Sequence, residues 1–229
     1  MTQDATMTEV YLEVSEKRAF AVALDWPGWC RSGRDDASAL QTLYEYGPRY
    51  ARVLETTSLG FCVPSEASEL VVVEQVTGDA TTDFGAPSIE LSRDAQPVEP
   101  DELARWQEVL EACWQAFDAA VEAARGHTLR KGPRGGGREL SKIVGHVRDV
   151  DAAYLKSLGG TMKVDRDADP DQVLAELREA ILTTLAAAVR GEVPARGPRG
   201  GVRWTPRYFV RRLAWHELDH VWEIEDRVE

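Results

Sequence analysis

Three histidines in the chain have the residue type and the spacing that a metal site requires. His216 and His220 are four positions apart on a predicted helix, so their imidazoles lie one turn apart on one face. His146 lies on the apolar face of an earlier predicted helix. Three inward histidines leave a tetrahedral ion with one open position, which is typical of a catalytic metal. We therefore predict a divalent metal bound by His146, His216 and His220; the alternative is three hydrogen-bonded core histidines.

A peptidase motif overlaps two of these histidines. The stretch H-E-L-D-H from His216 to His220 fits H-E-x-x-H, in which the glutamate, here Glu217, is the general base. We expect no usual downstream ligand, because the nearest carboxylates, Glu223 and Glu225, follow His220 too closely. Glu217 also points about 100° around the helix from His216. Glu217 remains a candidate catalytic residue, and a zinc peptidase remains an alternative.

Each of the three histidines is followed three residues later by a carboxylate: Asp149, Asp219 and Glu223. A carboxylate at this spacing can accept a hydrogen bond from the imidazole and orient it toward a metal. The alternative is that these side chains face solvent, which we expect for at least one of them.

Two similar basic loops precede the helices that carry the histidines. They read K-G-P-R-G-G-G-R over 131–138 and R-G-P-R-G-G-V-R over 196–203. In an up-and-down bundle both loops lie at one end, where glycine backbone, helix N-termini and arginines bind anions. The alternative is a pair of solvated loops or a docking surface for the acidic N-terminal part. The candidate substrate-binding residues are Arg134, Arg138, Arg199, Arg203, Tyr154 and Tyr208.

Four helices must position these groups. Apolar residues recur with helical periodicity in the segments 101–125, 138–158, 170–189 and 205–227. Helices of about 20 residues are roughly 30 Å long, and matched lengths favour a four-helix bundle. In the last helix, Thr205 and Pro206 suit the N-cap and the first helical position.

The first part of the chain predicts a small α+β unit. Strands are expected at 10–14, 18–25, 30–34 and 70–76, with a helix at 36–54 that Gly47-Pro48 interrupts. Residues 79–99 are turn-rich, with a short strand expected at 88–91. The predicted fold class is therefore an α+β domain of order β-β-β-α-β at 1–78, a linker at 79–99, and an all-α up-and-down four-helix bundle at 100–229.

Composition limits the classes of function. The net charge is −12, and residues 1–100 carry 17 acidic and 7 basic side chains, which argues against nucleic-acid binding. We find no apolar run that predicts a membrane span and no signal peptide, and the three cysteines are far apart, so we expect a cytoplasmic protein without disulfides.

Two resemblances follow from these motifs. The hairpin, D-W-P-G-W-C-R-S-G and D-D-A-S-A-L within 8–78 resemble the HicB-like fold. Four helices, a histidine in the second and H-x-x-x-H in the fourth resemble the DinB/YfiT-like metalloenzymes over 100–229. The second resemblance implies zinc or nickel on His146, His216 and His220. It also implies transferase, isomerase or hydrolase activity on a small anionic or thiol-conjugated substrate, with a low-molecular-weight thiol as a candidate cofactor and a homodimer as a candidate assembly. A non-catalytic scaffold with a HicB-like partner-binding domain is the alternative.

Overall fold

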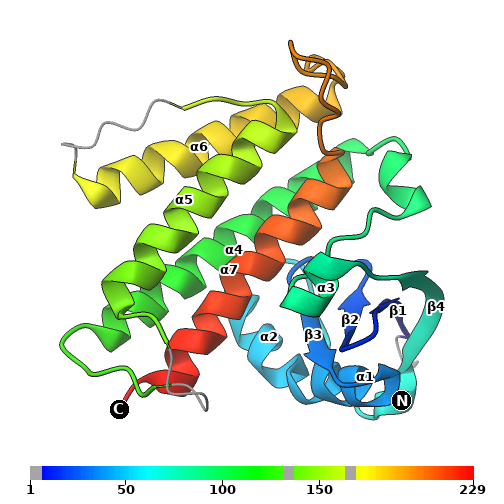
Figure 1. Ribbon diagram of the computed structural model, residues 1–229, viewed down its shortest axis with the longest axis vertical. Helices are drawn as coiled ribbons and strands as arrows, with labels where there is room; N and C mark the ends of the chain where they lie inside the picture. The colour runs from blue at the N-terminus through cyan, green and yellow to red at the C-terminus, as the bar shows by residue number, and fades with distance from the viewer. Residues whose placement is uncertain (1–6, 132–136, 163–168) are drawn as a thin grey trace.

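A four-stranded sheet lies beside four long helices (Figure 1). The computed structural model describes residues 7–131, 137–162 and 169–229. The strands stand in the order β3-β2-β1-β4, and only the β1–β4 pair is parallel. The prediction of a small N-terminal sheet followed by helices is confirmed. The strand bounds are β1 Thr8–Val14, β2 Ala19–Ala23, β3 Cys30–Gly33 and β4 Leu70–Thr77.

Two short helices occupy the stretch that predicts one long helix. Helix α1 (Asp36–Glu45) begins where the Asp35 carboxylate accepts the Ser38 backbone N–H at 2.8 Å. Helix α2 (Gly47–Val53) begins directly after Tyr46. Because Pro48 lacks an N–H and fits the first turn of a helix, the expected interruption separates two helices rather than bending one.

Successive side chains of a strand point to opposite faces of the sheet. In this protein both faces are covered. On one face, Val10 and Leu12 join the core formed by α1, α2 and the long helices. On the other face, Tyr11 and Phe20 form a second cluster with Trp215 of the last helix. The rings of Phe20 and Trp215 meet edge to face, 6.2 Å apart. The sheet and the helices therefore share a continuous core.

Gly28, in the W-P-G-W turn between β2 and β3, fits closely against the last helix. Its φ is +94°, and a Cβ there would lie 2.9 Å from Leu218 Cδ1 and 3.2 Å from the Ala214 carbonyl oxygen. Glycine avoids both the strained conformation and the contact.

A Gly28→Ala variant is expected to lower the free energy of unfolding by about 1–2 kcal/mol, because alanine is strained at positive φ and crowds the helix. Urea denaturation measures the change. Gly60→Ala is the matched control, since Gly60 also has positive φ (+69°) but open space around it. Equal losses in the two variants would show that the contact with the last helix is unimportant.

The turn-rich segment 79–99 is ordered against the rest of the protein. It contains α3 (Ala80–Phe84) and a 3₁₀ turn (Ser92–Ala95). The prediction of a strand at 88–91 is wrong. The Ser88 and Ile89 N–H groups donate to the buried Glu13 carboxylate, at 2.8 and 3.1 Å, and so do not join the sheet. The division into 1–78, 79–99 and 100–229 stays a prediction.

The four long helices are α4 (Pro100–Ala124), α5 (Leu140–Leu158), α6 (Pro170–Val189) and α7 (Pro206–Arg227), and every pair of them is in contact. Their directions differ from the expected up-and-down order. The end of α7 meets the start of α5, where Arg227 donates to the Arg138 carbonyl at 2.9 Å. The start of α7 meets the end of α5, where the Trp204 N–H donates to the Ser157 carbonyl at 3.0 Å. The second and fourth helices are therefore antiparallel.

The connection between α5 and α6 explains why these directions differ from the predicted order. Figure 1 shows α5 and α6 running in the same direction, so the end of α5 and the start of α6 lie at opposite ends of the long helices. The connection 159–169 is long enough, because about eleven residues reach roughly 36 Å when extended, whereas a 20-residue helix is roughly 30 Å long.

Helix α7 is the central element of the molecule. It lies between the sheet and the other long helices, and each residue from Arg207 to Leu218 is buried. The helix is therefore enclosed on all sides from Arg207 to Leu218, whereas Glu225 and Asp226 near its end are exposed. Thr205 precedes the first turn as predicted, although its hydroxyl makes no cap hydrogen bond.

Candidate metal centre

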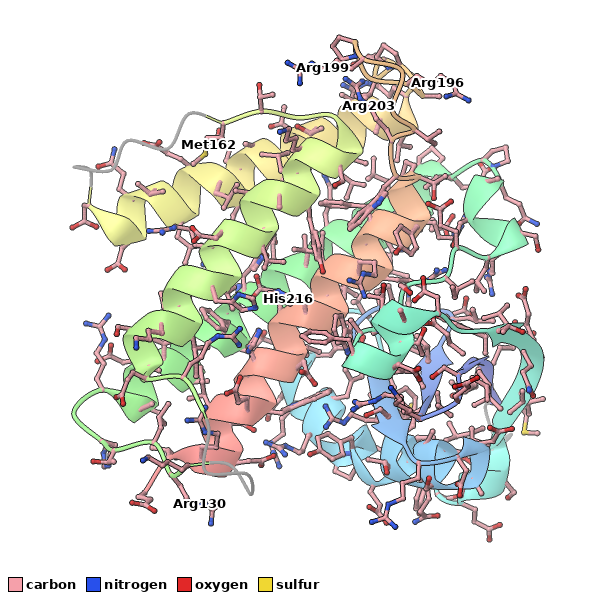
Figure 2. The ribbon with its side chains drawn as sticks, in the orientation of Figure 1. Arg130, Met162, Arg196, Arg199, Arg203 and His216 are labelled. Atoms are coloured by element: carbon pink, nitrogen blue, oxygen red, sulfur yellow. The ribbon has the colours of Figure 1, made fainter. Side chains whose placement is uncertain are left out.

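The three predicted histidines converge between α5 and α7. Their candidate ligand nitrogens all lie within 4.8 Å of one another, and the Nε2 atoms of His146 and His216 are 3.4 Å apart. Figure 2 shows His216 midway along α7, on the side that faces α5. Two nitrogens bound tetrahedrally to one zinc at about 2.0–2.1 Å lie roughly 3.3–3.4 Å apart. The histidines therefore fit a single metal ion.

The protonation of these imidazoles also suits a metal. Burial lowers the pKa of His216 well below its ordinary value, and the nearby His220 and His146 lower it further. Burial, with the positive charge of Arg138, likewise lowers the pKa of His146. A neutral imidazole is the form that coordinates a metal, so the folded protein keeps these two ligands in the binding form.

One of the three carboxylates that follow the histidines does orient its imidazole. Glu223 accepts a hydrogen bond from His220 Nδ1 at 2.8 Å, which leaves Nε2 to face the cluster. This hydrogen bond, supported by Arg227, lowers the pKa of Glu223. Asp219 pairs instead with Arg31 of β3, at 3.1 Å, and Asp149 pairs with its exposed neighbour Arg148. The expectation that at least one of them faces solvent is met by Asp149, which is 71% exposed.

Glu217, the candidate base, lies away from solvent beside another carboxylate. Glu217 and Asp151 of α5 are both 0% exposed, and none of their four carboxylate oxygens has a hydrogen-bond donor among the described residues. Burial and the Glu217 carboxylate raise the pKa of Asp151 well above its usual value, and burial raises that of Glu217. A base must reach the proton it removes, so this enclosed position argues against a catalytic role for Glu217.

The expectation that the two basic loops lie at one end of the long helices is wrong for the residues that the structure describes. Figure 2 shows Arg199 and Arg203 at one end of the long helices and Arg130 at the other, with His216 between them. The antiparallel arrangement of α5 and α7 causes this separation. Arg138 lies near enough to His146 to affect its pKa, whereas Arg203 donates to the Pro194 carbonyl in its own loop at 3.0 Å.

The remaining candidate substrate-binding residues have different surroundings. The Tyr154 ring lies 5.8 Å from the His216 ring, so this side chain borders the centre. Tyr208 is 5% exposed, and its hydroxyl donates to the Ser88 carbonyl at 2.9 Å. Arg134 lies outside the described residues.

Sequence reasoning missed Arg212, which contacts Tyr154 beside the histidines. Its guanidinium donates to the Tyr154 hydroxyl at 2.9 Å and to the Pro87 carbonyl. The available signal was its position, four residues before His216 and hence on the same face of the helix. In the sequence this arginine is one of three basic residues in the first turns of the helix, and no local signal distinguishes it from the other two.

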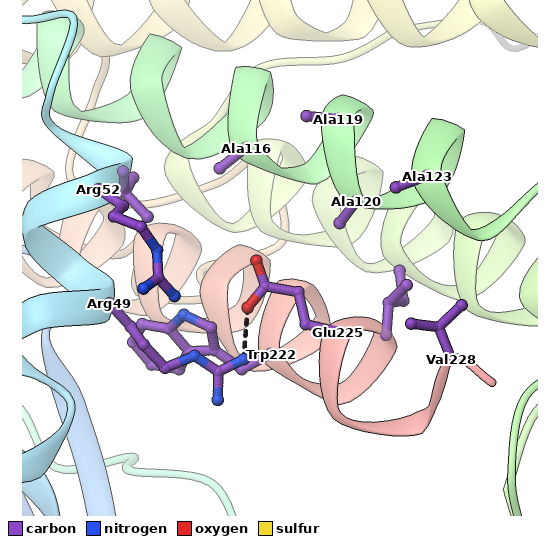
Figure 3. Close-up of a pocket in the computed structure, with 11 residues that line it drawn as sticks. Arg49, Arg52, Ala116, Ala119, Ala120, Ala123, Trp222, Glu225 and Val228 are labelled. Atoms are coloured by element: carbon purple, nitrogen blue, oxygen red, sulfur yellow. Dashed lines mark hydrogen bonds and ion pairs between the residues drawn. The ribbon is translucent and has the colours of Figure 1, made fainter.

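A pocket of about 250 Å³ lies elsewhere, between α2, α4 and the C-terminal part of α7 (Figure 3). An alanine face of α4 forms one wall, and Arg49 spans the opening to Glu225 through an ion pair. None of the three histidines lines this pocket. It is therefore separate from the histidine cluster.

These features define a class: a helical protein with a small N-terminal sheet and a three-histidine cluster that could hold a metal ion. The family model of the DinB superfamily matches residues 109–224, which contain all three histidines, and the chain belongs to that superfamily. Members of the superfamily commonly bind metal. Comparisons with curated proteins and with solved structures found no match. The family match does not reach the sheet, so the HicB-like resemblance stays a prediction. In the described residues, no helix is long and apolar enough to cross a membrane.

Proposed function

We propose that this protein is a metal-dependent enzyme whose ion, zinc or nickel, is bound by His146, His216 and His220. The observation that carries the proposal is the convergence of three histidine ligands, from two antiparallel helices, within 4.8 Å. A metal held by three histidines has an open position, where it can activate water or a thiol. The expected reaction is a transfer, isomerisation or hydrolysis of a small anionic or thiol-conjugated substrate. We further propose that α4–α7 act as the four-helix bundle that holds this centre.

The residues of the chain supply the position and the protonation state of the ligands. Glu223 fixes the orientation of His220, and it is held in turn by Arg227. His216 is 6% exposed, which limits access of water on its side of the centre. His146 is only partly buried, so a substrate can approach from the α5 side. This combination of buried ligands and one accessible side favours catalysis over a closed structural site.

Two alternatives make different predictions. A peptidase needs Glu217 as its base, but the fully buried position of Glu217 beside Asp151 does not favour it. A non-catalytic scaffold needs no metal, and the histidines would then be hydrogen-bonded core residues. Lowered histidine pKa values fit both a scaffold and an enzyme, so metal content is the measurement that separates them.

The test is the metal content of purified protein loaded with zinc or nickel and then dialysed. We expect about one ion per chain in the wild type and none retained in His146→Ala or His216→Ala, because two ligands hold zinc far more weakly than three. Inductively coupled plasma mass spectrometry gives the stoichiometry. Circular dichroism establishes that each variant is folded.

His127→Ala is the matched control, because the His127 imidazole forms a hydrogen bond with the backbone oxygen of Glu229 and lies outside the cluster. It should retain the ion. A wild type that retains no ion under any loading condition would contradict the enzyme and support the scaffold. An ion lost in His216→Ala but kept in His146→Ala would exclude the three-histidine centre.

A further inference from the structure

A buried arginine beside the histidine cluster lacks the anion that its neighbours have. Three arginines in the first turns of α7 are almost fully buried: Arg207, Arg211 and Arg212 are 9%, 6% and 8% exposed. Arg207 pairs with Glu102 and Arg211 with Asp94. Among the described residues, no carboxylate pairs with Arg212, which has only two neutral oxygens as partners. A buried cation without a counter-charge is costly, so this position favours an anionic ligand.

The position of Arg212 links that ligand to the candidate metal centre. Arg212 and His216 are four residues apart on α7, which is slightly more than one helical turn, or roughly 6 Å of rise. Tyr154 of α5 bridges the two, since its hydroxyl bonds Arg212 and its ring lies 5.8 Å from the ring of His216. A ligand whose anionic group is held by Arg212 and Tyr154 therefore needs only a few covalent bonds to reach the histidines.

Aromatic rings complete the surroundings of this pair. The Trp204 ring lies 4.8 Å from the Tyr154 ring, and the Arg212 guanidinium lies 4.9 Å from the Trp215 ring. One arginine in an aromatic setting suits a flat monoanion, which the guanidinium fork can hold through two parallel hydrogen bonds. A phosphate dianion carries a second negative charge that a single guanidinium does not balance.

We propose that Arg212 and Tyr154 form a carboxylate-binding subsite, so that the substrate is a small carboxylate whose reacting group lies a few bonds away. The Tyr154 hydroxyl accepts from Arg212 and keeps its own hydrogen, which can be donated to the carboxylate. This inference rests on the proposed function for the role of the carboxylate as a substrate. Carboxylate binding by Arg212 and Tyr154 does not itself require a bound metal. It assigns specificity to Arg212 in place of the loop arginines.

The test compares benzoate with benzamide, which is flat and uncharged, by isothermal titration calorimetry on metal-free and zinc-loaded protein. We expect benzoate to bind the metal-free wild type at least about tenfold more tightly than benzamide, because charged hydrogen bonds are stronger. Arg212→Gln should lose about tenfold or more of the benzoate affinity, and Tyr154→Phe about three- to tenfold. Neither variant should change benzamide binding by as much.

Arg138→Gln and Arg203→Gln are the controls, since each removes an arginine at one end of the long helices. Both should bind benzoate within about twofold of the wild type. If Arg212→Gln does not fold, Tyr154→Phe decides, because it removes one hydroxyl only. The proposal is overturned by unchanged benzoate affinity in folded variants, by a loss confined to Arg138→Gln, or by equal binding of benzoate and benzamide.

The outcome is separable from that of the proposed function. Selective benzoate binding that depends on Arg212, in a protein that retains no metal, would support the subsite and contradict the metalloenzyme. Metal retention without selective benzoate binding would support the metalloenzyme and overturn the subsite.

Discussion

An Asp94→Ala variant is expected to lose about 3–5 kcal/mol of its free energy of unfolding, because it leaves a buried guanidinium unpaired. The Asp94 side chain is 1% exposed and that of Arg211 is 5% exposed. Two parallel hydrogen bonds join them, one of them 2.8 Å long, and Asp94 also accepts the Leu91 N–H at 2.7 Å. This pair fastens the segment 79–99 to α7.

Urea denaturation at neutral pH measures the loss. Asp118→Ala is the matched control, because Asp118 also forms two hydrogen bonds with an arginine, Arg178, but is 54% exposed. We expect the control to cost about 1 kcal/mol or less, as solvent screens the charges. The double variant Asp94→Leu with Arg211→Met should recover most of the stability, because it removes both charges together. A loss of less than about 1 kcal/mol of unfolding free energy in Asp94→Ala would mean that this buried ion pair stabilises the protein no more than an exposed pair does.

Replacing Asp151 by asparagine is expected to stabilise the protein as the pH rises. Asp151 and Glu217 share a buried environment, and burial with the neighbouring carboxylate raises the pKa of Asp151 well above its usual value. An unfolded aspartate ionises near pH 3.9. Above that pH the folded chain holds a proton that the unfolded chain releases, so the wild type loses stability with increasing pH. An asparagine amide releases no proton, and this loss disappears.

The expected result is equal stability of Asp151→Asn and wild type near pH 4, and an advantage of about 2–3 kcal/mol for the variant near pH 8. Urea denaturation across this range, with a chelator present, measures the difference without a contribution from metal. Asp149→Asn, at an exposed position on the same helix, should show no such pH dependence. A constant difference between Asp151→Asn and wild type at all pH values would indicate that Asp151 is ionised in the folded protein.

The histidine cluster could be predicted because its signals are local. The spacing of His216 and His220 fixes their common helix face through the helical repeat, and His146 lies in line with the apolar residues of its own helix. One further assumption, that the two helices face each other, was needed to predict that the three histidines lie together. Their distances fit a metal in the structure, as the sequence predicted.

The arrangement of charges could not be predicted in the same way. The loops at 131–138 and 196–203 are alike in sequence, but their placement depends on the path from α5 to α6, which no local pattern specifies. Since about eleven residues are enough to span the length of a helix, both parallel and antiparallel arrangements were possible. The assumption of an up-and-down order placed the arginines together, whereas the structure separates them.

The sequence by itself therefore determined the strands of the sheet, the long helices, the interruption at Pro48 and the helix face that carries the histidines, because these depend on propensity and periodicity within one segment. Only the tertiary structure decided the roles of the buried charges. Helix α7 lies between a sheet and three helices, so its charged residues Arg207, Arg211 and Arg212 are buried together with the apolar ones. The pairing of Arg211 with Asp94, and of Arg212 with the Pro87 carbonyl, depends on segments more than one hundred residues away in the chain. Burial and long-range pairing are properties of the packed molecule, and they give each of these similar arginines different partners.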